Sequence, residues 1–281
     1  MNKQTSFLRA LRPFSLIVAI ATCGLGVSLA LLEGSTSLPL ALLVVANGVL
    51  LQIAVNLIND QRDIDNEQFD ASQRQAIRRN TRLGYLAMSV AVVIGIYMVT
   101  LRGWPLLLLG AVGIFGAWGY TGGRINYKAR GLGILLVFLL MGVLLIGGSY
   151  YVVSGRYNLD ILLLSLPFSL LSSLLLLSNE LRDYEADLAA GIRTLSVRLG
   201  YRFGVRLYYW LVALVYLVSA LLYRAGLLQD ILLLLITALV LWQPLKLLHA
   251  PAARRQRLTP LTGRYYLIFS MAYLLTLWLP Q

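Results

Sequence analysis

The sequence is poor in the residues that a soluble domain of its size would need. Of its 281 residues, 13% are charged and 59% hydrophobic, whereas soluble domains carry about 25% charged residues. It holds one cysteine, Cys23, and one histidine, His249. A disulfide within the chain and a cysteine–histidine set for a soft metal are therefore both excluded. This composition favours a membrane protein.

Nine apolar stretches fill most of the chain, and each is long enough to cross the hydrocarbon core as a helix. The first follows three basic residues, as a signal peptide would, but its length and the many later spans predict that it stays as a transmembrane helix. We predict an all-α, polytopic membrane protein whose residues 1–281 form one domain. The expected spans are 13–32, 39–59, 84–101, 104–121, 132–153, 160–178, 204–223, 228–248 and 264–280.

The basic residues predict the orientation of this protein. With nine spans, 21 of the 24 lysines and arginines fall on the side of the N-terminus, and Arg102, Arg156 and Arg224 fall on the other. Basic residues collect on the cytoplasmic side, so we expect the N-terminus and the loops of that side in the cytoplasm. The net charge of +12 is then explained without nucleic acid. These loops are 60–83, 122–131, 179–203 and 249–263.

Nine of the twelve acidic residues lie in two of these loops, which topology alone does not require. Polar residues spaced three or four apart share one face of a helix, and carboxylates stacked in this way repel one another. A hard divalent cation removes the repulsion, and Mg²⁺ prefers carboxylate and phosphate oxygens. The two stripes are Asn56, Asp60, Asp63 and Glu67, and then Asn179, Asp183 and Asp187.

Basic residues near both stripes complete a candidate diphosphate site, because arginine and lysine bind phosphate oxygens. Magnesium would stabilise the diphosphate as a leaving group, and the allylic cation left behind needs a dry cavity with aromatic faces. Tyr120 and Tyr184 lie close to the charged segments and are the aromatic candidates. The basic candidates are Arg74, Arg78, Arg79, Arg82, Arg124, Lys128, Arg130, Arg193 and Arg198.

Asn59-Asp60-x-x-Asp63 and Asp183-x-x-x-Asp187 resemble the two aspartate motifs of the UbiA-type intramembrane prenyltransferases. Three longer stretches are most similar to the branch that prenylates 1,4-dihydroxy-2-naphthoate in menaquinone biosynthesis. They are 52–60, Tyr120-Thr-Gly-Gly123 with Gly131-Leu-Gly133, and 178–200. The resemblance implies two similar halves, with motifs at about 56–67 and 179–187, and nine helices around a central cavity open to the cytoplasm. It also implies a polyprenyl diphosphate donor and an aromatic acceptor that loses carbon dioxide to give demethylmenaquinone.

The pattern and the resemblance together assign residues to roles around two Mg²⁺ ions. The predicted catalytic residues are Asp60, Asp63, Asp183, Asp187, Tyr120 and Tyr184. The predicted metal ligands are Asp60, Asp63, Glu67, Asp183 and Asp187. The predicted substrate contacts are Asn56, Asn59, Glu67, Arg74, Arg78, Arg79, Asn179, Arg182, Arg124, Lys128, Arg193 and Arg198. The expected location is a bacterial-type plasma membrane, with no protein partner.

Several residues depart from the pattern of the naphthoate branch. Ile192 stands where relatives often have lysine, Ile134 where they often have an acid, and Glu67 where many have aspartate, while 73–80 lacks their usual glycine and proline. These changes leave other aromatic acceptors open, namely 4-hydroxybenzoate, homogentisate or a tetrapyrrole precursor. Two alternatives of another class are a secondary transporter and a scaffold protein.

Overall fold

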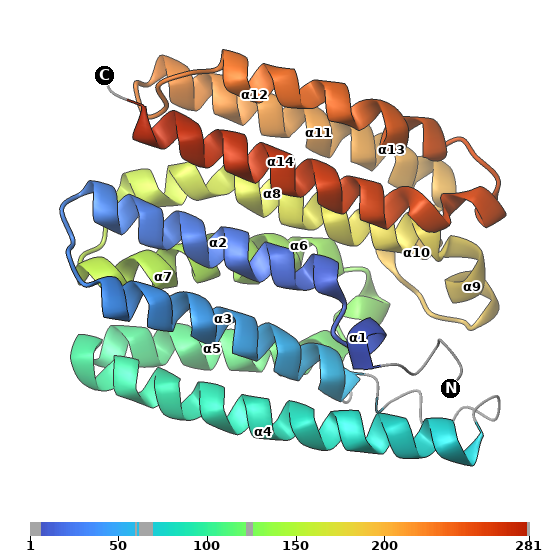
Figure 1. Ribbon diagram of the computed structural model, residues 1–281. Coiled ribbons are helices and arrows are strands. Elements are labelled where there is room, and N and C mark those ends of the chain that lie inside the picture. Colours follow the sequence, from blue (N-terminus) through green and yellow to red (C-terminus); the bar gives the residue numbers. More distant parts are fainter. Residues whose placement is uncertain (1–6, 60, 62–69, 122–125, 280–281) are drawn as a thin grey trace.

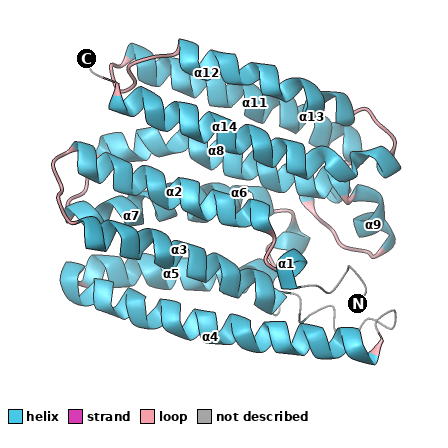
Figure 2. Cartoon of the chain, in the orientation of Figure 1, coloured by secondary structure: helices cyan, strands magenta, loops and turns pink. Residues whose placement is uncertain are grey.

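The computed structural model describes residues 7–59, 61, 70–121 and 126–279. Within these ranges the chain is helical, without strands, and its long helices lie side by side in one bundle (Figures 1 and 2). The prediction of an all-α fold is confirmed. Asp60, Asp63, Glu67 and Arg124 lie outside the described residues.

The first part of the bundle consists of one short helix and four long, uninterrupted ones. The short helix is α1 (Phe7–Ala10), and the long helices are α2 (Pro13–Leu32), α3 (Leu38–Asn59), α4 (Ala71–Arg102) and α5 (Trp104–Thr121).

The later part contains more short and irregular helices. These elements are η3 (Lys128–Arg130), α6 (Gly133–Val137), the π-helical η4 (Phe138–Leu144), α7 (Leu145–Ser154), α8 (Leu159–Arg182), α9 (Tyr184–Ala189), α10 (Leu195–Leu199), α11 (Tyr201–Arg224), α12 (Leu232–Ile236), the 3₁₀ segment η5 (Thr237–Leu241), α13 (Trp242–Leu247), η6 (Ala252–Arg257) and α14 (Leu258–Trp278).

Among the described residues, six helices are long and apolar enough to cross a membrane: α2, α3, α4, the continuous α6–η4–α7 rod, α8 and α11. Two shorter apolar helices cover Trp104–Ala117 and Leu232–Leu247. The polytopic membrane fold is therefore confirmed, whereas the count of nine spans stays a prediction.

Helix α4 begins earlier than the apolar stretch at 84–101 suggested, because Asp70 caps it. The Asp70 carboxylate accepts a hydrogen bond from the Gln73 backbone N–H at 2.8 Å, and the Gln73 side chain accepts one from the Asp70 N–H at 2.9 Å. The bond from Gln73 lowers the pKa of Asp70. One member of the first acidic loop therefore serves as a helix cap.

Helix α8 is the central helix of the bundle. Of its most apolar window, 78% is buried, against 17% for the window of α4. It contacts α11, α14 and the η4 segment. Ser165, Ser169, Ser172 and Ser173 are all buried on α8, and such small residues let neighbouring helices approach closely. The end of α8 is therefore held firmly within the bundle.

The segments predicted to share one side of the membrane gather at one end of the bundle. In Figure 1 the right-hand end holds the starts of α2, α4, α11 and α14, the ends of α3 and α8, and the short helices α9 and α10. This arrangement brings the end of α3, which leads to the first acidic loop, to the same end as the second acidic segment.

Candidate functional site

The second acidic pair lies where α8 turns into α9. Asp183 follows the last residue of α8, and the Asp187 backbone N–H donates to the Asp183 carbonyl at 2.8 Å, so the two residues are one helical turn apart. Both are half-buried. The structure therefore brings together the two carboxylates that the spacing predicted to share a face.

The environment of Asp187 leaves its negative charge partly uncompensated. Burial raises the pKa of Asp187, Lys128 lowers it, Asp183 raises it further and Arg182 lowers it. A carboxylate in such surroundings is stabilised by added positive charge. The positive charge of Lys128, from η3, thus acts on Asp187, as predicted for a cation near a diphosphate.

The acidic pair suits a hard divalent cation, since both donors are carboxylate oxygens and Mg²⁺ is typically held by one or two carboxylates plus substrate phosphates. Within the described ranges no group of three or more histidine, cysteine or acidic side chains is positioned to hold a metal. Further ligands from Asp60, Asp63 and Glu67 stay a prediction, since these residues lie outside those ranges.

Arg182 orients Asp183 through a two-pronged contact. Its Nε donates to Oδ1 at 2.8 Å and its Nη2 to Oδ2 at 2.5 Å. The side chains are 26% and 39% exposed. Each carboxylate oxygen has more than one acceptor site, so Asp183 keeps capacity for a metal ion while the guanidinium fixes its direction.

Tyr120 lies at the end of α5, at the same end of the bundle as this acidic pair. The charges of Glu180, Arg12 and Asp187 act on its hydroxyl. Its ring approaches Gly133 closely, because a Cβ atom on that glycine would lie 3.4 Å from the Tyr120 hydroxyl oxygen. Tyr120 at the end of α5 therefore packs against the start of α6.

Tyr184, the second selected aromatic, packs in a different direction. Its ring makes an edge-on contact with Tyr201 at 5.4 Å between centroids, and the Arg255 guanidinium lies 4.4 Å from the centroid of the same Tyr201 ring. This ring contact thus joins α9 to α11, and the catalytic role of Tyr184 stays a prediction.

Arg255 anchors the junction of α8 and α9 from the loop before α14. It is buried, with 3% exposure; its Nη1 donates to the Leu181 carbonyl at 2.7 Å, and its Nη2 contacts the Glu185 carboxylate. The last carbonyls of a helix have no partner within the helix. Arg255 therefore stabilises the turn that holds Asp183 and Asp187.

Replacing Arg255 by methionine should loosen this turn. We expect about 1–3 kcal/mol of lost stability, because the Leu181 carbonyl would be left buried without its donor, together with a roughly tenfold lower kcat, since small misplacements of catalytic groups are costly. Thermal unfolding in detergent and turnover would measure the two effects. Arg254→Met is the matched control, since Arg254 is exposed; equal behaviour of both variants would contradict this role.

Glu180 has a structural role that sequence reasoning missed. It is 5% exposed, and its carboxylate accepts hydrogen bonds from the backbone N–H and the hydroxyl of Ser196, both at 3.0 Å. Ser196 lies in the first turn of α10, where free N–H groups attract an anion. Glu180 thus ties α8 to α10. This contact could have been predicted from the sequence Thr194-Leu195-Ser196, with which a short helix begins.

Asn56, predicted to contact substrate, is buried and fully engaged as a donor. Its Nδ2 donates to the Leu11 carbonyl at 2.8 Å and to the Ser15 hydroxyl at 2.7 Å, while its Oδ1 accepts from Gln52 at 2.9 Å. These bonds attach the N-terminal segment to α3. The role of Asn56 toward substrate stays a prediction.

Arg198, another predicted substrate contact, bridges two loops at this end of the bundle. Its Nη2 donates to the Ala129 carbonyl at 2.7 Å and its Nε to the Arg193 carbonyl at 3.1 Å. The remaining predicted substrate contacts lie at the same end of the bundle. Three side chains are half-buried, namely Asn59, Arg74 and Asn179, and three are exposed, namely Arg78, Arg79 and Arg193.

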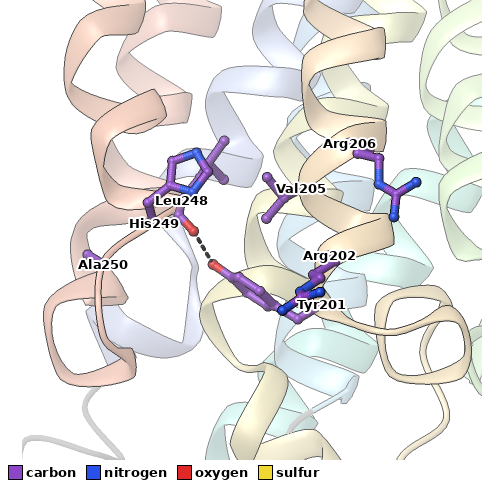
Figure 3. Close-up of a pocket in the computed structure, with 7 residues that line it drawn as sticks. All are labelled: Tyr201, Arg202, Val205, Arg206, Leu248, His249 and Ala250. Atoms are coloured by element: carbon purple, nitrogen blue, oxygen red, sulfur yellow. Dashed lines mark hydrogen bonds between the residues drawn. The ribbon is translucent and has the colours of Figure 1, made fainter.

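A cavity of about 420 Å³ opens at this end of the molecule, and neither Asp183 nor Asp187 lines it. It lies between the start of α11 and the segment after α13, and Tyr201 and Leu248 form parts of its wall (Figure 3). The predicted central cavity beside the aspartates is thus a separate feature and stays a prediction.

The sequence profile of the UbiA prenyltransferase family matches residues 17–277. The chain is 28% identical over 222 residues to the 1,4-dihydroxy-2-naphthoate octaprenyltransferase of Bacillus subtilis (strain 168), covering 73% of this chain and 71% of that protein. It is 31% identical over 217 residues to the protein of the same name from Escherichia coli (strain K12), covering 71% and 70%. The human UbiA prenyltransferase domain-containing protein 1 is 31% identical over 233 residues, covering 79% and 69%.

Solved structures share the fold at low sequence identity. A UbiA homologue from Aeropyrum pernix K1 has a TM-score of 0.68 and 18% identity, covering 95% of this chain and 97% of that chain. A UbiA homologue from Archaeoglobus fulgidus, bound to GPP and Mg²⁺, has a TM-score of 0.65 and 15% identity, covering 95% and 99%. These similarities show a common helical architecture.

Proposed function

The chain belongs to the UbiA prenyltransferase family, and we propose that it carries out the Mg²⁺-dependent transfer of a polyprenyl chain from its diphosphate to 1,4-dihydroxy-2-naphthoate. The observation that carries this proposal is the one-turn spacing of Asp183 and Asp187, with Lys128 and Arg182 acting on the same charges. The names of the bacterial relatives support the acceptor. Family membership also argues against the transporter and scaffold alternatives.

The residues at this end of the bundle would have different roles in the reaction. When bound, Mg²⁺ supplies charge that makes the diphosphate a better leaving group. Asp183 and Asp187 would hold Mg²⁺, with Asp60, Asp63 and Glu67 as further proposed ligands, and we propose two ions for the full set. Lys128 would bind a diphosphate oxygen by a charge-assisted hydrogen bond. Tyr120 would present its ring to the allylic carbon as positive charge develops there.

The bond changes of this reaction balance without an added acid or base. The allylic C–O bond breaks, and its electrons leave with the diphosphate. A ring carbon bearing the carboxylate forms the new C–C bond. The bond from that carbon to the carboxylate then breaks, its electrons return to the ring, and carbon dioxide leaves. While the allylic cation exists, the protein has to keep water away from it.

The proposed setting is a bacterial plasma membrane, with the acidic loops in the cytoplasm. Support comes from the basic residues that share the end of the bundle with the acidic pair. A soluble acceptor carrying a carboxylate would reach the site from that side, while the polyprenyl chain would enter from the lipid.

A product assay with several acceptors tests this function. Purified protein would be given a polyprenyl diphosphate, Mg²⁺ and either 1,4-dihydroxy-2-naphthoate, 4-hydroxybenzoate or homogentisate. We expect kcat/KM to be at least about 100-fold higher for the naphthoate, since a site that hydrogen-bonds its substrate strongly rejects poorly matched ones. Extraction of lipid-soluble product and its mass would report the reaction.

Two controls sharpen the result. Removal of divalent ions with EDTA should abolish product, and added Mg²⁺ should restore it. Turnover of 4-hydroxybenzoate or homogentisate in preference to the naphthoate would keep the prenyltransferase class and refute the acceptor, whereas full activity in EDTA would refute the metal.

A further inference from the structure

The cavity between α11 and the end of α13 is a site that the transfer reaction does not use. Its walls come from two segments near each other in space but about 45 residues apart in sequence (Figure 3). The Tyr201 hydroxyl donates to the Leu248 carbonyl at 2.7 Å, which ties the segments together and fixes the width of the groove. The lining residues are Tyr201, Arg202, Val205, Arg206, Leu248, His249 and Ala250.

Two arginines give this groove an unbalanced positive charge. Arg202 and Arg206 lie one helical turn apart at the start of α11, and both side chains are exposed. Neither forms an ion pair or hydrogen bond with another described residue. Glu185, the carboxylate of nearby α9, is engaged by Arg255. The first turn of α11 contains no acidic residue, so its positive helix end adds to the field.

On the opposite wall, His249 adds a hydrogen-bonding group that contacts Tyr209 of α11. The Tyr209 hydroxyl and His249 Nε2 lie 3.1 Å apart, and Tyr209 is 41% exposed. In Figure 3, Arg202 lies beside Tyr201, while Arg206 extends away from His249. The groove is therefore open and cationic at its rim, with apolar Val205 and Leu248 at its floor.

An exposed apolar stripe continues directly from the two arginines along α11. Residues spaced three or four apart share a helix face, and Arg202 and Arg206 are followed at this spacing by exposed apolar side chains toward the middle of the span. Those side chains are Trp210, Leu214, Leu217 and Leu221, exposed by 66%, 37%, 55% and 56%. A cationic end followed by a lipid-facing apolar stripe matches an amphiphile with an anionic head.

We propose that this groove binds the phosphate headgroup of an anionic phospholipid, whose acyl chain lies along Trp210, Leu214 and Leu217. Arginine forms charge-assisted, often paired, hydrogen bonds with phosphate oxygens. Basic pockets between transmembrane helices are recognised sites for anionic headgroups. A free phosphate would gain the arginine contacts but leave the apolar stripe unused, so the continuity of the two surfaces favours a lipid.

Native mass spectrometry of the full-length protein in a neutral detergent would test this site. Dioleoyl phosphatidylglycerol and dioleoyl phosphatidylcholine would be titrated in parallel onto the wild type, the double variant Arg202→Gln/Arg206→Gln, and Arg224→Gln. We expect phosphatidylglycerol to bind the wild type at least tenfold more tightly than phosphatidylcholine. The double variant should lose that preference, and Arg224→Gln, altered at the opposite end of the same helix, should keep it.

Three outcomes would overturn the proposal. Equal binding of both lipids by the wild type would remove the headgroup preference, and unchanged preference in the double variant would place it elsewhere. Inorganic phosphate competing as well as phosphatidylglycerol would indicate a site for free anions. Because both arginines are exposed and make no ion pair or hydrogen bond with the residues that the structure describes, thermal unfolding of the double variant should match the wild type, which separates lost binding from lost folding.

Discussion

Asp187→Asn is expected to lower kcat by about 1000-fold or more while leaving the protein folded. Asparagine keeps the size of the side chain but removes the negative charge that would hold the metal ion, and such electrostatic stabilisation acts chiefly in the transition state. The carboxylate is also half-buried beside Asp183 and Lys128, so no solvent ion easily takes its place. Single-turnover rates with saturating Mg²⁺ would measure the loss.

Asp160→Asn is the matched control for this substitution. Asp160 lies in the first turn of α8, at the other end of the helix that leads to Asp183, and is exposed. It should retain activity within about twofold, since exposed surface substitutions have small effects. If Asp187→Asn kept more than a tenth of the wild-type rate, the acidic pair would not be the metal site.

Gly142→Ala is expected to lower the stability of the protein strongly. A Cβ atom at this position of η4 would lie 2.4 Å from Ser169 Cβ and 2.5 Å from Ser169 Cα, which belongs to the backbone of α8. Because a helix backbone cannot rotate away as a side chain can, the two helices must separate. Overpacking of this kind costs about 3 kcal/mol, which corresponds to a melting temperature lower by roughly 6–12 °C.

Gly148→Ala provides the comparison within the same helical rod. Among the described residues outside its own helical turns, no heavy atom lies within 4 Å of a Cβ built there, and alanine is a better helix former than glycine by roughly 0.5–1 kcal/mol. Its melting temperature in detergent should equal or slightly exceed that of the wild type. Equal stability of the two variants would show that η4 and α8 do not pack as closely as the structure has them.

Periodicity predicted which residues share a helix face, and the backbone at the junction of α8 and α9 agrees with it for the second acidic pair. Asp183 and Asp187 are one turn apart, as their spacing indicated. The long apolar helices were also readable, since length and hydropathy suffice to identify them. What these patterns leave open is which neighbour packs against a given face.

The acidic residues show most clearly that spacing along the chain does not predict contacts between segments. Asp70 and Glu180 belong to the same two acidic segments as the proposed ligands, yet one caps α4 and the other binds the first turn of α10. Tyr184 likewise packs against Tyr201, a residue from the next long helix. Each of these roles depends on a contact between segments, which local spacing does not encode.

The irregular helices were beyond prediction for a related reason. The stretch 132–153 reads as one apolar span, but the structure divides it into α6, the π-helical η4 and α7. Widened helical turns of this type depend on neighbouring backbone, and here the neighbour is Ser169 of α8, close to Gly142. An apolar stretch has the same hydropathy whether it forms an α-helix or a π-helix, so hydropathy could not predict η4.

We expect the protein to adapt to changes in bilayer thickness through α4, which is largely exposed, rather than through α8, which other helices enclose. A peripheral helix can tilt to match a thinner or thicker hydrocarbon layer at modest cost, whereas a helix surrounded by protein cannot tilt without disturbing its neighbours. Hydrophobic mismatch is thereby taken up at the edge of the bundle. The height of Asp183 and Asp187 relative to Lys128 then stays constant across membranes that differ in acyl chain length.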